Sequence, residues 1–120
     1  MMIWIMTPGF SDPISINVKG RELRGVVDKA NYEKFRDAVQ GKLEAIPDNL
    51  GRPMKTQVFK PEHVYSKVRN VAPDLIVQFR GLSWRSICGV GHSKLYLQDN
   101  DTGPDGCNHS KHGAFILSAP

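Results

Sequence analysis

Residues 107–112, CNHSKH, bring one thiol and two imidazoles together just before the apolar run AFIL. Thiolate and imidazole are ligands that zinc prefers, and a closed structural zinc site takes four of them in a tetrahedron. Cys107, His109 and His112 supply three, and their spacing differs from the paired-cysteine pattern of a zinc finger. A self-contained site would need Cys88 or a partner chain as well. Taken alone, these residues favour a turn or a partial metal site over a complete zinc centre.

Two glycine-containing segments nearby offer other chemistry. Residues 99–106, DNDTGPDG, place Asp99, Asp101 and Asp105 around two glycines, and alternating aspartates can wrap a calcium ion. An EF-hand loop has a bidentate glutamate at its twelfth position, where this chain has Ser110. A turn whose side chains bond their own backbone is the favoured interpretation. The segment GVGHS lacks the GxGxxG spacing of a phosphate loop and also fits a turn.

The elements that must position these segments include one long helix. Its apolar residues recur at spacings of three and four, which places them on a single helical face. They are Tyr32, Phe35, Val39, Leu43 and Ile46, with charged residues on the other side. Pro47 ends the helix because proline cannot donate to the hydrogen-bond ladder. We therefore expect a buried stripe packed on strands that carry Ile16 and Ile76.

Strands are expected on both sides of this helix. ISINV alternates apolar and polar residues, which is typical of a strand with one buried face. The other expected elements are a strand in KTQVFK, a helical turn opened by Pro61, a buried strand over residues 75–79, and weaker strands in LSWRSI, KLYLQ and GAFILSAP. This order predicts an α/β fold, a small mixed sheet with one main amphipathic helix packed on it. Residues 1–13 are expected to be an irregular N-terminal segment, and residues 14–120 a single domain.

Composition limits the classes of function. The chain has 120 residues, of which 40% are hydrophobic and 23% charged, as expected for one soluble globular domain. Its apolar runs are too short to cross a membrane, and its start lacks the features of a signal peptide, so the cytoplasm and free thiols are expected. The net charge of +4 favours acidic partners. Because the basic residues are scattered, nucleic acid is not an expected partner.

Five segments, in order, resemble one known family. They are INVKGRELRGVV, NYEKFRDAVQGKLEAI, KTQVFKPEHVY, APDLIVQF and NHSKHGAFILSAP. Together they resemble the C-terminal region of the type I phosphodiesterase/nucleotide pyrophosphatase family of the alkaline phosphatase superfamily, from about Ile14 to Pro120. The resemblance implies the C-terminal part of an alkaline-phosphatase-like fold and a phosphorylated small molecule or nucleotide as substrate. It also implies two metal ions, usually zinc, which stabilise the attacking and leaving oxygens of a phosphoryl displacement.

The resemblance assigns one metal ligand in this chain. The last ligand of the family is a histidine four residues before a glycine that opens a terminal strand, and His109 stands four residues before Gly113. The resemblance gives His112 no such role. The chain contains neither the nucleophile segment nor the other ligands of the family, and its start looks like that of a truncated product. It is therefore expected to supply pocket walls and one ligand, to bind zinc weakly or not at all, and to be inactive alone. The alternative is a small basic binding module for a nucleotide or another acidic partner.

Overall fold

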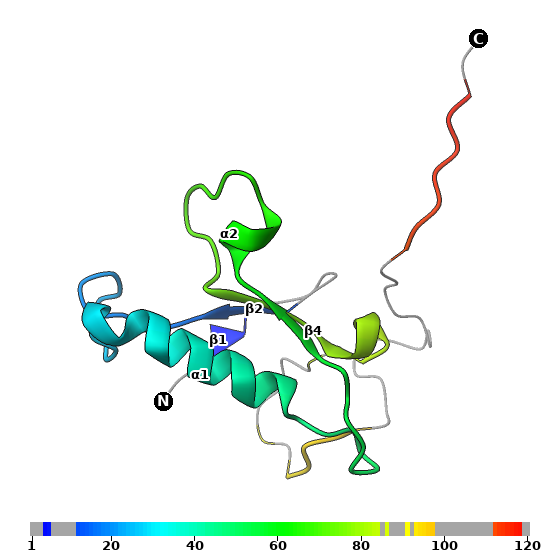
Figure 1. Cartoon of the computed structure of the whole chain (residues 1–120), viewed down its shortest axis with the longest axis horizontal. Coiled ribbons are helices and arrows are strands. Elements are labelled where there is room, and N and C mark those ends of the chain that lie inside the picture. The colour runs from blue at the N-terminus through cyan, green and yellow to red at the C-terminus, as the bar shows by residue number, and fades with distance from the viewer. Residues whose placement is uncertain are drawn as a thin grey trace.

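A computed structural model describes residues 4–5, 12–84, 86, 91, 93–97 and 112–118. Its elements are β1 (Trp4–Ile5), β2 (Asp12–Ser15), the 3-10 turn η1 (Lys29–Asn31), α1 (Tyr32–Glu44), β3 (Gln57–Phe59), α2 (Pro61–Val64), β4 (Leu75–Gln78) and the 3-10 turn η2 (Phe79–Leu82). Figure 1 shows the strands crossing above α1. The helix α2 and the loop after it project from the strands on the side away from α1. None of the described helices is long and apolar enough to cross a membrane.

The strands form one sheet in the order β1-β2-β4-β3. Each described pair is antiparallel, with Ile14 opposite Leu75 and Val58 opposite Val77. The expected sheet was mixed, because a strand–helix–strand order commonly makes two parallel neighbours. Here β4 lies between β2 and β3, so the two strands joined through α1 are not adjacent. The α/β character is confirmed, and the mixed pairing is wrong for the described strands.

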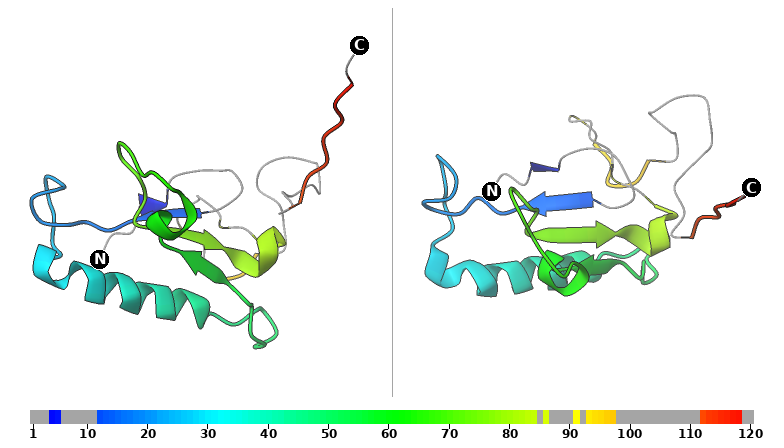
Figure 2. Two further views of the ribbon diagram at one scale, coloured as in Figure 1. Left: turned by 45° about the horizontal axis from the view of Figure 1, so that its top comes forward. Right: turned by 90° about the horizontal axis from the view of Figure 1, so that it is seen from above.

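The core lies between the sheet and α1, which covers one face of it (Figure 2). Ile14, Val39, Val58, Leu75 and Val77 form the buried cluster, and Phe35 and Leu43 pack against it. The expected alternation in residues 14–18 is confirmed, since Ile14, Ile16 and Val18 are all buried. The predicted apolar stripe is confirmed at its centre by the burial of Val39. Tyr32 and Ile46, at the ends of that stripe, are only partly buried.

The N-terminal segment contributes more to the sheet than expected. Trp4 pairs with Ser15 and Ile5 with Ile14, and β2 begins at Asp12. Residues 4–5, 12 and 13 therefore belong to strands, although the whole of residues 1–13 was expected to be irregular. Proline at position 13 argues against a strand when the sequence is read alone, because proline has no amide hydrogen to donate to the hydrogen-bond ladder of a sheet.

The expected strands after β4 are not seen in the part of the chain that the structure describes. The chain turns away at η2, where Arg80, Gly81 and Leu82 have φ values of 46°, 60° and 72°. Residues 83–84, 86, 94–97 and 112–118 form neither helix nor strand. Phe115, Ile116 and Leu117 in the final described segment are highly exposed. Both neighbours of β4 are already in place, so these apolar runs have no free edge of that strand to pair with.

Candidate functional site

A buried carboxylate at the start of β4 organises the main polar cluster of the structure. Asp74 is only 3% exposed. Its carboxylate accepts two hydrogen bonds of 2.7 Å from the guanidinium of Arg21, one of 2.5 Å from the amide of Ile16, and one from the hydroxyl of Tyr32. These partners come from the chain after β2 and from α1. One carboxylate therefore joins three segments that are far apart in the sequence.

Arg36 extends this cluster from the middle of α1. Its guanidinium is buried, and its Nε donates to the carbonyl oxygen of Asp74 at 2.9 Å. Its two terminal nitrogens bind the Glu62 carboxylate in a bidentate pair at 2.5 and 2.7 Å. A planar guanidinium suits this arrangement because its donors form a fixed fork. We call Arg21, Tyr32, Arg36, Glu62 and Asp74 the Asp74 cluster.

The ring of Tyr32 contacts both arginines of the cluster. The guanidinium carbon of Arg21 lies 5.8 Å from the ring centroid, and that of Arg36 lies 5.6 Å away. Both distances allow a cation–π attraction. Tyr32 thus attracts both guanidinium groups while its hydroxyl donates to Asp74. The ring lowers the cost of bringing two guanidinium groups together.

The loop that carries Arg21 is held by its backbone. The Lys19 amide donates to the Val27 carbonyl at 2.9 Å, so the two ends of the loop lie together. Gly25 is needed for this closure, because a Cβ atom there would lie 2.1 Å from the Val18 carbonyl oxygen. No side chain can be accommodated at that distance. The glycine therefore fixes the position from which Arg21 reaches Asp74.

The cluster sets the protonation states of its members. Burial opposes ionisation of Asp74, but hydrogen bonds from Arg21, the Ile16 amide and Tyr32 outweigh it and hold the Asp74 pKa below its usual value. The bidentate contact with Arg36 lowers the pKa of Glu62 to about 2. Burial and the bond to Asp74 raise the pKa of Tyr32 to about 12. None of these three pKa values lies near neutrality, where general acid–base catalysis is most efficient. The arrangement suits a structural role.

An open pocket of about 300 Å³ adjoins the cluster. It is lined by Val18, Gly20, Arg21, Lys29 and Tyr32. Arg21 already binds two carboxylates, those of Asp74 and Glu22. The Lys29 ammonium lies close to Gly20, within 3.6 Å of where a Cβ atom would stand. Lys29 is thus the cation of this pocket that can meet an anionic ligand.

Most of the residues singled out in the sequence as ligands lie outside the described ranges. These are Cys88, Asp99, Asp101, Asp105, Cys107 and His109. His112 is described and exposed, and His63 lies exposed on α2. Within the described ranges, no three His, Cys, Asp or Glu side chains are grouped so that they could hold a metal ion. His109 itself lies outside these ranges, and its assignment as a metal ligand stays a prediction.

Sequence analysis missed the Asp74 cluster, although one signal for it was present. Arg36 stands four residues after Tyr32 and three before Val39, which places it at the edge of the apolar stripe. A charged residue at such a position must find a partner when the face is buried. The partners, Glu62 and Asp74, are remote in sequence, and no local pattern identifies them.

The fold and the cluster define a small antiparallel α/β unit with an internal ion-pair centre and an open basic pocket beside it. Comparison of the chain with protein-family models, curated proteins and solved structures finds no match. Its function has to be inferred from its residues and their geometry.

Proposed function

We propose that the chain is the C-terminal part of a metal-dependent phosphohydrolase of the type I phosphodiesterase/nucleotide pyrophosphatase kind. One structural observation supports this proposal. Three of the segments that resemble the family carry Arg21, Tyr32 and Asp74, and these residues bond to one another. Residues from three of these segments thus contact one another in the described fold.

In this proposal the chain supplies walls of a substrate pocket and, through His109, one metal ligand. A neutral imidazole is a common zinc ligand. The substrate would be a phosphorylated small molecule or a nucleotide. One histidine cannot hold two cations, so the 120-residue chain by itself would show no phosphodiesterase turnover.

The coding DNA upstream of Met1 tests this proposal. We expect it to continue, in frame or after a frameshift, into a segment with a serine or threonine nucleophile and metal-binding aspartates. The joined protein should hydrolyse a nitrophenyl phosphodiester when zinc is added. His109→Ala should reduce that turnover by at least about tenfold through weaker metal binding, whereas the matched variant His112→Ala should retain it. Full activity of His109→Ala, or an upstream region without such a segment, would contradict the proposal.

The pocket next to the Asp74 cluster favours a second candidate, a binding module for a nucleotide. It combines the Lys29 ammonium with the ring of Tyr32 at an open surface. Titration with a nucleoside diphosphate, followed by calorimetry, tests this candidate. Lys29→Glu should abolish binding, and Lys34→Glu on the outer side of α1 is the matched control. Absence of saturable binding by the unaltered chain would exclude this candidate.

A further inference from the structure

α2 and the loop that follows it project from the sheet on the side away from α1 (Figure 1). Both ends of this segment are anchored by one side chain. Arg36 binds the Glu62 carboxylate at the start and the Asp74 carbonyl at the end. Pro61 is also buried. A guanidinium in the core thus holds the base of the loop, and residues 63–71 are presented to solvent.

The side chains of this loop are unusual for an exposed segment. Four large apolar residues on it are exposed, and Val71 at 99% is almost completely so. They are Val64, Tyr65, Val68 and Val71. Scattered exposed apolar residues are normal, but four within nine residues make a local patch. Elsewhere in the described chain, Leu50 is exposed alone in its segment, Leu23 has only Val26 near it in sequence, and Phe115, Ile116 and Leu117 form another exposed run.

The charge of the loop has one sign. Lys67 and Arg69 lie between its apolar residues, and residues 63–73 contain neither aspartate nor glutamate. The acidic groups at the base of the loop are already paired with cations. Glu33 and Asp37 on α1 bind Lys60 at 3.0 and 2.8 Å, and Glu62 binds Arg36. The tip of the projection is therefore basic and apolar, and a complementary partner must be acidic and apolar.

We propose that residues 63–71 form a docking surface for an acidic protein segment that carries apolar side chains. A loop of this size covers less area than a stable interface requires, so binding is weak, rapid and sensitive to salt. An anionic membrane is disfavoured as the partner, because basic segments that bind such membranes usually have roughly four to eight Lys or Arg residues. The loop has two. The proposal is independent of the phosphohydrolase assignment, because it uses neither His109 nor the pocket at Lys29.

Fluorescence anisotropy with a defined probe tests this surface. The probe is a labelled peptide in which glutamate alternates with leucine, and its matched control has glutamine in place of each glutamate. Two double variants alter the surface, Lys67→Glu with Arg69→Glu and Val68→Ser with Val71→Ser. Their controls alter exposed basic and apolar residues elsewhere, Arg24→Glu with Lys34→Glu and Leu23→Ser with Leu50→Ser. Circular dichroism and thermal denaturation verify that each variant folds.

The acidic peptide should bind saturably at low salt, and binding should weaken as salt is added. Each surface variant should weaken it at least about tenfold, and each control should change it by less than about twofold. Changes in backbone amide NMR chemical shifts on adding the peptide should be confined to the loop and its anchors. The proposal is wrong if the acidic peptide does not bind, if the glutamine peptide binds equally well, or if the control variants lose as much affinity. Binding to vesicles of phosphatidylserine and phosphatidylcholine without binding to the peptide would also overturn it.

Discussion

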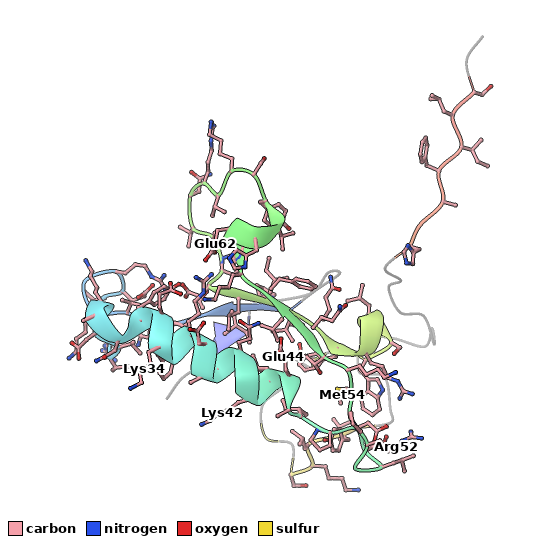
Figure 3. All side chains as sticks on the ribbon, viewed as in Figure 1. Lys34, Lys42, Glu44, Arg52, Met54 and Glu62 are labelled. Atoms are coloured by element: carbon pink, nitrogen blue, oxygen red, sulfur yellow. The ribbon has the colours of Figure 1, made fainter. Side chains whose placement is uncertain are left out.

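The Nε atom of Arg36 donates to the carbonyl oxygen of Asp74 at 2.9 Å, although 38 residues separate the two in the chain. The same guanidinium binds Glu62 at the start of α2. Figure 3 shows Glu62 at the base of the projecting segment, whereas Lys34 and Lys42 extend from the side of α1 that faces away from the sheet. Arg36 is therefore the helix residue that joins α1 to both ends of the loop.

Replacing Arg36 should destabilise the fold. Arg36→Leu leaves the Asp74 carbonyl without this donor, and we expect a loss of about 1–3 kcal/mol in the free energy of unfolding. Glu62 is half-exposed, so water can solvate its freed carboxylate and limit the loss. Arg36→Lys should give an intermediate value, because an ammonium cannot span both partners. Urea denaturation measures the change, with Lys34→Leu as an exposed control. Equal losses in Arg36→Leu and Lys34→Leu would contradict the assignment.

Asp74 should contribute to stability at neutral pH and lose that contribution in acid. Its pKa is below the usual 3.8 in the folded chain, and the pKa of Glu62 falls from 4.5 to about 2. A carboxyl group whose pKa is lower in the folded than in the unfolded chain stabilises the folded state at pH values above its unfolded-state pKa. That stabilisation is lost as the pH falls through the folded-state pKa. Stability should thus decline from about pH 4.5 towards pH 2. Asp74→Asn should lower stability at neutral pH by about 2 kcal/mol and flatten this decline. An unchanged acid profile in Asp74→Asn would contradict the role of the carboxylate.

At alkaline pH, the dependence of folding stability on pH should be set in part by Tyr32. Its pKa rises from 10.0 to about 12, so the folded chain keeps a proton that the unfolded chain releases. The associated stability is present below pH 10.0 and is lost as the pH rises through about 12. Tyr32→Phe should remove this part of the alkaline decline, and Tyr65→Phe, at an exposed position, should not. Tyrosinate absorbance combined with urea denaturation at each pH measures both effects. Loss of the decline in Tyr65→Phe instead would show that the titrating group was misassigned.

Shortening a side chain at the centre of the core should lower the free energy of unfolding most. Leu75 is fully buried at 0% exposure and belongs to the central strand β4. Leu75→Ala should cost about 2–5 kcal/mol, because it removes transfer energy and leaves a cavity. Leu23→Ala is the matched control at an exposed leucine and should change stability by less than about 0.5 kcal/mol. A small effect at Leu75 would show that the sheet is not packed as described.

The sequence predicted the elements whose signals are local. The three-four spacing of Tyr32, Val39 and Leu43 predicted α1, and Pro61 predicted the short helix that begins there. The run of apolar and β-branched residues from Leu75 predicted β4. Each of these signals lies within a single helix or strand. Local signals need no knowledge of the remote partners.

Features that depend on remote partners were not predictable in the same way. The position of β4 between β2 and β3 follows from tertiary packing, and it makes the described pairs antiparallel. The partners of Arg36 come from two later segments of the chain. The apolar residues of GAFILSAP predicted a strand, but residues 113–118 form none, because strand pairing needs a partner strand that a local pattern does not identify. His109 lies outside the described residues, and its assignment stays a prediction.

The central place of β4 has a consequence for the order of events during folding. The helix, β3 and β4 are close in sequence, whereas Ile16 must meet Asp74 across 58 residues. Contacts between distant residues form more slowly, because a longer loop must close before they bring any gain. On the ribosome, β2 is synthesised long before its partner strand. It has no partner on that side until β4 has emerged, so we expect the pairing of β2 with β4 to form last.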